Sequence, residues 1–485
     1  MKHIIFIMVL ASILISSCSK DFIEIIPESM VTVEKVYKTD KDFQDAVIGV
    51  YNGLRAPYFQ FWQFGDLRAD DTQQDAQRWV AEVRVDDFVM DVNDPLLINS
   101  WRDYYSIIFR INSLLSNIEK ADVSIVPNKE LYIGEAKFIR ALVYFDLVRI
   151  FGDVPMLTNP LSIDEAYKIG REKTDIIYNE IIIKDLLDAE NSLPEKQAGT
   201  NVGRATKGAA TALLGKVYLT RHDFANAESE LQKVTTMGYA LLNNFNDLFD
   251  YTKEHTIEYI FDIEYIDGGF GLGSNFTSIF NMEGQDVGPA LVSEIKRIYN
   301  ITAPQSGGAG TPSAELRALF DTQDLRKDIT VATGVYDQNG NFVPIVGGIT
   351  GFTKKYMTSL SINNDSRANW KVIRYADVLL MYAEVLNENG KTNEALVYLN
   401  QVRKRAGLAE YLNLTQAEAR EKVYLERRFE LYLEGHRWFD LVRTGRALEV
   451  MQSRGMKPHM TVFPIPRSQI EVVNDPSIFS QNPGY

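Results

Sequence analysis

The amino-acid sequence predicts a mostly α-helical fold: a tetratricopeptide-like helical-repeat core, or α/α superhelix, interrupted by a loop-rich insertion that contains short β-hairpins. Three observations lead to this fold class. Apolar residues recur at helical spacing in several long segments. A two-helix pattern occurs twice, and the stretch between its copies is rich in Gly, Asn, Thr and Ser. With 485 residues, 45% of them hydrophobic, the chain can bury a large core.

The first helices are expected in the N-terminal half of the chain. Thr39 is a candidate N-cap, and apolar residues at helical spacing follow it until Pro57, which should end the helix. Just beyond, Phe59, Phe61 and Trp62 are expected to pack beneath the helices. Further helices are expected over 99–118, 128–151 and 174–192, the last with Thr174 as its N-cap.

The two-helix pattern begins at Leu214 and recurs 168 residues later. Its large and small residues, at 214–218 and 227–231, match the tetratricopeptide spacing that lets two antiparallel helices pack closely. Residues 382–386 and 395–399 occupy the same places without a gap. Two such units so far apart indicate a helical framework interrupted by a long insertion, and such frameworks usually bind rather than catalyse.

The insertion, roughly residues 243–367, differs in composition from the helical segments. Its polar, glycine-rich stretches favour loops, and loops of this length are usually functional. Residues 338–341, Gln-Asn-Gly-Asn, lie between two apolar runs and predict a β-hairpin turn. The glycines of 269–273 do not match a dinucleotide-binding motif, because the third is misplaced and no βαβ context surrounds it.

Residues 425–443, LERRFELYLEGHRWFDLVR, carry apolar stripes that must lie against other helices. Glu426, Glu430 and Glu434 stand at i, i+4 spacing, where like charges disfavour an isolated helix. They are either a general acid and base or buried ion pairs that fix how helices dock. The neighbouring arginines favour ion pairs, because they would keep the pKa of each carboxyl low. The i, i+3 pairs expected here are Glu434 with Arg437 and Asp440 with Arg443.

The C-terminal tail is expected to end the chain in extended form. Pro464 and Pro466 forbid helix where they stand, and Asn482-Pro483-Gly484 is typical of a turn.

Several of these motifs, in order, carry a family resemblance. ERRFELYLEGHRWFDLVR, together with RYADVLLMYAEVLNENG at 374–390 and the closing IPRSQIEVVNDP and QNPGY, strongly resembles the SusD/RagB family of outer-membrane nutrient-binding lipoproteins. The resemblance implies one SusD-like domain over residues 31–485, with its tail packed back on the helices. The helical core is then expected at about 31–57, 97–242 and 368–485, with variable loop regions at about 58–96 and 243–367.

The same resemblance implies a function. Members of this family bind a nutrient, in most cases a glycan, and pass it to a SusC-like TonB-dependent β-barrel transporter on which they sit as a lid. The expected partners are therefore an oligosaccharide and that transporter. Some relatives handle peptides instead, so a peptide ligand stays open, as does a scaffold whose repeats bind only protein.

The N-terminus has the layout of a secretory signal. Lys2 precedes an apolar run over 4–15, which is too short to span a bilayer comfortably, and Ser16 and Ser17 then lead to Cys18. A cysteine in this place resembles a bacterial lipobox, with a plain signal peptide as the alternative. We therefore expect a signal peptide over 1–17, acylation of Cys18, a tether over 18–30, and a lipid-anchored protein on the exterior of the outer membrane.

Composition and motifs exclude several classes of function. The formal net charge of −14 and pI of about 5.0 argue against nucleic acid and anionic membrane surfaces as partners. Cys18 is the only cysteine, and none of the five histidines has a second at metal-ligand spacing. No Walker loop, GxSxG or HExxH occurs, so no catalytic residue, metal or cofactor is expected. A glycoside hydrolase, which needs only two carboxylates, is a remote alternative.

The candidate ligand-binding residues lie in the two variable regions. Trp79 follows the polar stretch DDTQQDAQR, so it is the tryptophan expected to be exposed, and a sugar ring can stack on an exposed indole while nearby polar groups bind its hydroxyls. Packing on the core is the alternative for each aromatic residue. The candidates are Asp71, Gln74, Arg78 and Trp79, with Tyr265, Phe270 and Asn275 of the insertion as a second half of the surface.

Overall fold

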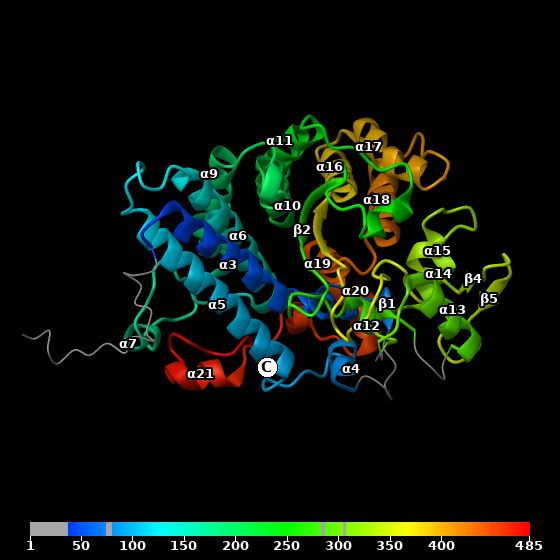
Figure 1. Cartoon of the computed structure of the whole chain (residues 1–485), viewed down its shortest axis with the longest axis horizontal. Coiled ribbons are helices and arrows are strands. Elements are labelled where there is room, and N and C mark those ends of the chain that lie inside the picture. The colour runs from blue at the N-terminus through cyan, green and yellow to red at the C-terminus, as the bar shows by residue number, and fades with distance from the viewer. Residues whose placement is uncertain (1–36, 74–79, 283–286, 304–306) are drawn as a thin grey trace, which may run out of the picture.

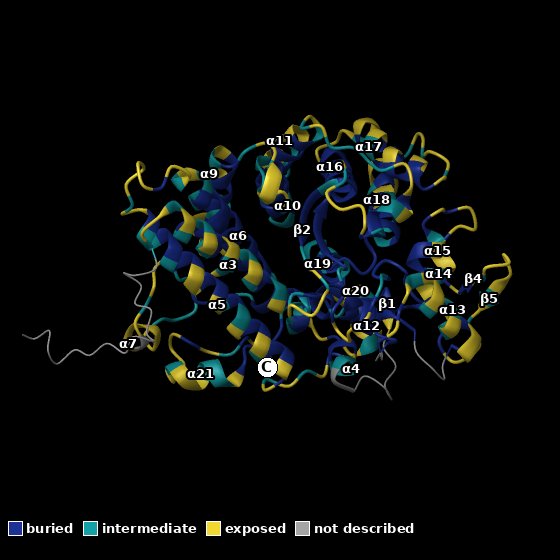
Figure 2. Ribbon diagram, viewed as in Figure 1, coloured by how far each residue is buried: buried dark blue, intermediate teal, exposed yellow. Residues whose placement is uncertain are grey.

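A computed structural model describes residues 37–73, 80–282, 287–303 and 307–485. Helices dominate it, and its strands form three small two-stranded sheets, which confirms the predicted fold class (Figure 1). The predicted signal peptide, Cys18 and the tether lie outside the described residues. Figure 2 shows that buried residues line the inner faces of the helices, while exposed residues mark their outer faces.

The N-terminal helices begin close to where the sequence predicts them. α3 (Asp40–Tyr58) starts after Thr39, whose hydroxyl accepts from the Asp42 backbone in a capping box. It runs one residue past Pro57, so the prediction that Pro57 ends the helix is corrected by one position. Thr174 is not an N-cap: Lys173 holds that position and the Thr174 hydroxyl donates to Asp153. The other helices here are α5 (Pro95–Ile118), α6 (Lys129–Phe151), α8 (Thr174–Ile177), the π-helical η3 (Tyr178–Ile183) and α9 (Lys184–Ser192).

The two predicted repeats are helix pairs. α10 (Lys207–Thr220) packs on α11 (Phe224–Thr235), α16 (Tyr375–Glu388) packs on α17 (Thr392–Arg405), and α11 lies against α16. The small residue of the pattern, Gly215, is needed because a Cβ at this position would lie 2.7 Å from the Leu231 side chain. The repeat therefore brings together helices that are far apart in the chain.

The insertion is less loop-like than the sequence predicts. β2 (Tyr259–Ile263) pairs antiparallel with β6 (Trp370–Arg374), which joins the two ends of the insertion to the core. The expected hairpin is confirmed: β4 (Gly334–Tyr336) pairs with β5 (Phe342–Pro344) around residues 338–341. Short helices fill much of the rest: η5 (Phe245–Phe249), α12 (Phe276–Phe280), α13 (Pro289–Tyr299), α14 (Ala314–Leu319) and α15 (Lys327–Thr330).

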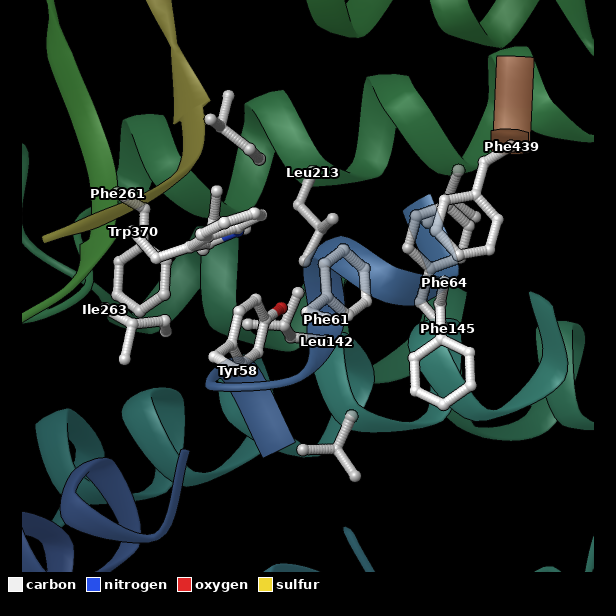
Figure 3. Packing of buried hydrophobic residues seen from close by; sticks show 14 of the residues in the cluster. Tyr58, Phe61, Phe64, Leu142, Phe145, Leu213, Phe261, Ile263, Trp370 and Phe439 are labelled. Atoms are coloured by element: carbon white, nitrogen blue, oxygen red, sulfur yellow. The ribbon is translucent and has the colours of Figure 1, made fainter. Parts of the chain in front are cut away.

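An aromatic cluster links the N-terminal helices, the sheet and the C-terminal block. Phe61 stacks between Tyr58, with ring centroids 4.9 Å apart, and Phe439, at 5.7 Å. Trp370 of β6 meets Phe61 edge-on at 6.3 Å (Figure 3). Phe61 and Trp62 are buried and Phe59 is half-buried, which confirms that these rings pack beneath the helices.

The glutamates of the 425–443 segment form buried ion pairs. They lie on α18 (Gln416–Leu431) and on the turn that leads to α19 (Arg437–Arg443). Glu426 and Glu430 both pair with Arg326, at 2.7 and 3.0 Å, and Glu434 pairs with Arg374 at 2.7 Å. These contacts confirm the ion-pair interpretation. The expected pair of Glu434 with Arg437 is wrong, since Arg437 binds Asp70 instead, whereas Asp440 pairs with Arg443 at 2.9 Å as predicted.

These pairs should make the protein sensitive to acid. Burial alone would raise the pKa of Glu434, but Arg374 and Lys355 lower it to about 2. A carboxyl whose pKa is lowered by folding stabilises the folded state at pH values above its unfolded pKa of about 4.3. This stabilisation is lost as the pH falls toward 2. We expect the free energy of unfolding, measured in urea, to fall between pH 5 and pH 2, and to fall less steeply in Glu434→Gln. Equal slopes in the two proteins would contradict this role.

The C-terminal tail is not extended throughout. α21 (Arg467–Val473) begins directly after Pro466, because a proline just before a helix removes no helical hydrogen bond. The tail packs back on the core, as the resemblance implies: the Phe463 N–H donates to the Ile150 carbonyl at 2.7 Å. Asn482 is the first residue of the predicted turn at the C-terminus, and its side-chain amide donates to the Phe151 carbonyl at 2.9 Å.

Candidate functional site

The two variable regions meet at more than one place, and we call one of these places the junction: residues 71–73, 279–282 and 307–313. β1 (Thr72–Gln73) pairs antiparallel with β3 (Thr311–Pro312). The Ala309 N–H donates to the Ile279 carbonyl at 2.9 Å, at the end of α12. Segments that are more than 200 residues apart in the chain thus lie side by side, and the residues of the junction are buried except Gln73. The candidates Gln74, Arg78 and Trp79 lie outside the described residues, between Gln73 and α4 (Val80–Asp86).

Arginines from the C-terminal block hold the junction in place. Arg428 of α18 pairs with Asp71 at 2.6 Å and with Glu315 of α14 at 3.1 Å, and Arg437 pairs with Asp70 at 2.7 Å. Asp71 is only 2% exposed. The proposal of Asp71 as a ligand contact is therefore corrected: its carboxylate is used to fix the segment that precedes Trp79.

The three candidates of the insertion have different surroundings. Tyr265 is buried, with its ring centroid 5.2 Å from that of Phe59 and its hydroxyl donating to the Arg55 carbonyl at 3.1 Å. It is corrected from a ligand contact to a residue that supports α3. Asn275 is half-buried at the start of α12. Phe270 is 71% exposed on the loop 266–272, which the Ile266 N–H closes by donating to the Leu272 carbonyl at 3.1 Å.

A groove of about 770 Å³ lies between α3, residues 200–204, β2 and Leu272, and we call it the α3–β2 groove. A second groove of about 370 Å³ shares residues 202–204 as a wall. Neither was predicted from the sequence, because Asn52, Arg55 and Glu264, which line the larger groove, belong to no motif. The one available signal was Phe270, whose loop ends at the groove.

The described residues give no sign of a metal site or a membrane span. Among them, no three His, Cys, Asp or Glu side chains are grouped so that they could hold a metal ion. No helix in the described ranges combines the length and apolar character needed to cross a bilayer.

Comparison with known protein families gives two matches. A model described as the SusD family matches residues 320–485, and a model described as starch-binding associating with outer membrane matches residues 21–219. Together the matches leave out only the first 20 residues and 220–319, which contain much of the insertion.

Individual proteins agree with these matches. SusD-like protein P25 of Formosa agariphila is 28% identical over 95% of both chains. The starch-binding protein SusD of Bacteroides thetaiotaomicron is 24% identical over 73% of this chain and 72% of its own. Among solved structures, a laminarin-binding SusD-like protein matches with a TM-score of 0.77 and 26% identity, over 93% of this chain and all of its own. The motifs, the repeat architecture and these matches lead to one conclusion: the chain belongs to the SusD/RagB family.

Proposed function

We propose that this protein binds an oligosaccharide at the outer surface of the outer membrane and passes it to a SusC-like TonB-dependent β-barrel transporter. The observation that carries this proposal is the junction. Arg428 and Arg437 fix two variable segments side by side on a helical framework, which is how a binding surface is varied without changing the fold. The names of two relatives, a laminarin-binding and a starch-binding protein, support a glycan as the ligand class.

In this proposal the membrane attachment comes from Cys18. Acylation of this residue would hold residues 31–485, acting as one SusD-like domain, against the membrane through the tether. The name of the family model that matches residues 21–219 supports an association with the outer membrane. Labelling of cells with a membrane-permeant lipid precursor should mark the wild type and not Cys18→Ala, and equal labelling would contradict the anchor.

We propose binding rather than catalysis. A general acid needs a pKa near the working pH, but Glu430 and Glu434 are buried, and arginine partners keep the pKa of each carboxyl low despite that burial. The acids that first suggested chemistry are thus held in structural pairs.

The binding test uses the full-length chain in detergent and a panel of neutral oligosaccharides, with tryptophan fluorescence as the readout. We expect saturable quenching by at least one glycan, and an affinity at least tenfold lower in Trp79→Ala, because a stacked indole is a main contact for a sugar ring. Phe342→Ala, which removes an exposed aromatic ring from the β4–β5 hairpin, is the control and should bind as wild type. Unchanged affinity in Trp79→Ala would show that Trp79 does not contact the ligand. Binding of peptides but of no glycan would show that the ligand is a peptide.

Transfer to the transporter is tested separately. Full-length protein purified from its own outer membrane should co-purify with a large β-barrel protein. Deletion of the gene for the binding protein should abolish uptake of the glycan that it binds. Uptake that survives the deletion would contradict the delivery step.

A further inference from the structure

We propose that the α3–β2 groove is a second binding site for a neutral oligosaccharide, separate from the junction. This inference rests on the proposed function and adds a second place of contact. The groove volume of about 770 Å³ lies within the range of pockets that hold small ligands. In Figure 1, α3 and β2 flank the centre of the molecule, whereas β1 and α12 of the junction lie toward the lower right.

The walls of the groove include exposed aliphatic side chains. Ile48 of α3 is 51% exposed and Val202 is 42% exposed, and both line the groove together with the half-buried Leu272. Exposed aliphatic side chains in a concave surface can cover the CH face of a sugar ring. Phe270 is exposed on the loop that Leu272 closes, but it is not one of the residues that line the groove.

The hydrogen-bonding groups of the groove are already held in position. The Arg55 side chain donates from Nε to the Glu264 carbonyl at 2.7 Å and from Nη1 to the Asn52 side chain. The Tyr265 ring lies 5.9 Å below the guanidinium. Among the described residues, Nη2 of Arg55 has no hydrogen-bond partner, so it can donate to a ligand hydroxyl. Because the guanidinium is fixed before binding, little conformational entropy is lost when it binds a ligand.

The electrostatics of the groove favour a ligand without charge. Burial and the nearby Asp262 and Glu254 raise the pKa of Glu264 to about 8, although Arg55 opposes this, so the Glu264 carboxyl is mostly protonated at pH 7. Asp45 and Asp262 line the groove and offset the charge of Arg55, so an anionic sugar gains little there, and Arg55 would repel a cation.

The remaining charges of the groove are paired. Asp45 pairs with Lys41 at 2.6 Å, Asp262 pairs with Lys371 at 3.3 Å, and Arg204 binds the buried Glu135. A hydroxyl-rich, neutral chain fits a site that has hydrogen-bonding groups, apolar walls and little free charge.

The test fills the groove and measures binding by isothermal titration calorimetry on the full-length chain. The probes are laminarihexaose, maltohexaose and xylohexaose, with an alginate hexamer as the anionic counterpart. Asn52→Trp places a large ring in the groove, and Ala56→Trp places the same ring on the same helix, at an exposed position outside it. We expect a neutral hexamer to bind at two sites in the wild type and Ala56→Trp, and at one site in Asn52→Trp. Circular dichroism checks folding, and Ile48→Asn, a milder change, should weaken the same site three- to tenfold.

Each outcome separates the groove from the junction. Two sites that persist in Asn52→Trp and Ile48→Asn, or an alginate hexamer bound in the groove in place of neutral probes, would overturn the inference. If Trp79→Ala lost all binding and Asn52→Trp lost no binding, the proposed function would stand and the groove would not be a binding site. If Asn52→Trp lost all binding and Trp79→Ala lost no binding, the groove would be the binding site and the junction would not be one. Absence of binding by every neutral probe would overturn both.

Discussion

Replacing Arg374 by Met is expected to lower the free energy of unfolding by about 3–5 kcal/mol. The Arg374 side chain is 2% exposed and pairs with three buried carboxylates, those of Glu258, Glu430 and Glu434. Methionine keeps the volume but leaves these carboxylates without their main shared partner, and an unpaired buried charge is far costlier than the lost pair itself. Urea unfolding at pH 7, followed by circular dichroism, measures the change.

Arg420→Met is the matched control for this prediction. Arg420 pairs with Glu388 at 2.5 Å, but its side chain is partly exposed, so water can solvate the carboxylate that remains. The same substitution should therefore cost less than about 1 kcal/mol there. Similar losses in the two variants would contradict the view that burial of the carboxylates determines the cost.

Gly65→Ala is expected to destabilise the protein by about 3 kcal/mol or more, at the upper end for an overpacked core. Gly65 lies in the π-helical η2 (Gln63–Leu67), and a Cβ there would lie 2.5 Å from the Cα of Gly435. The obstacle is backbone, which cannot rotate away as a side chain can. The clash would also pull the Gly435 N–H from Asp66, to which it donates at 2.7 Å. Thermal unfolding measures the effect as a fall in Tm.

Gly49→Ala provides the control in a helix of the same region. Gly49 lies inside α3, and a Cβ at this position would meet no atom within 4 Å. Alanine should therefore stabilise the protein by about 0.5–1 kcal/mol, because it restricts the unfolded chain more than glycine does. A loss of stability in Gly49→Ala as large as that in Gly65→Ala would show that close backbone contact is not the cause.

The helices could be predicted because their determinants are local. Thr39 caps the residues that follow it, and Gly215 lies at a fixed spacing from Leu231, which packs on it. The short helices of the insertion escaped prediction for the converse reason. α12 and α14 are each only five or six residues long, too short for helical periodicity to show, and packing rather than sequence pattern stabilises them.

Partner choice among charged residues depends on the path of the chain. Glu434 and Arg437 stand three residues apart, as an i, i+3 pair would. α18 ends at Leu431, and the chain turns through positive φ angles at Leu433 and Gly435 before α19 begins at Arg437. Glu434 therefore faces Arg374 and Arg437 faces Asp70. That the glutamates would be paired was predictable from their charge, but not which arginine each would bind.

The candidate site was predictable only as a region. The sequence located it in two variable segments, and the structure joins these segments through β1 and β3. Asp71 sits in a polar stretch that suggests exposure, yet its partner Arg428 is 357 residues away and no local pattern reveals it. Arg55 and Glu264 were missed for the same reason, since they come together only because α3 lies beside β2.

The pairing of β2 with β6 also has a consequence for how such proteins diversify. Paired strands lie about 4.8 Å apart, so the segment between Ile263 and Trp370 leaves and rejoins the helices at neighbouring points. Lengthening a segment that is closed at its base costs little, about 0.6 kcal/mol for each doubling. The loops of this segment can therefore change in length at little cost, whereas a chimera joined at these two residues must keep the pairs of Arg326 with Glu430 and of Lys355 with Glu434.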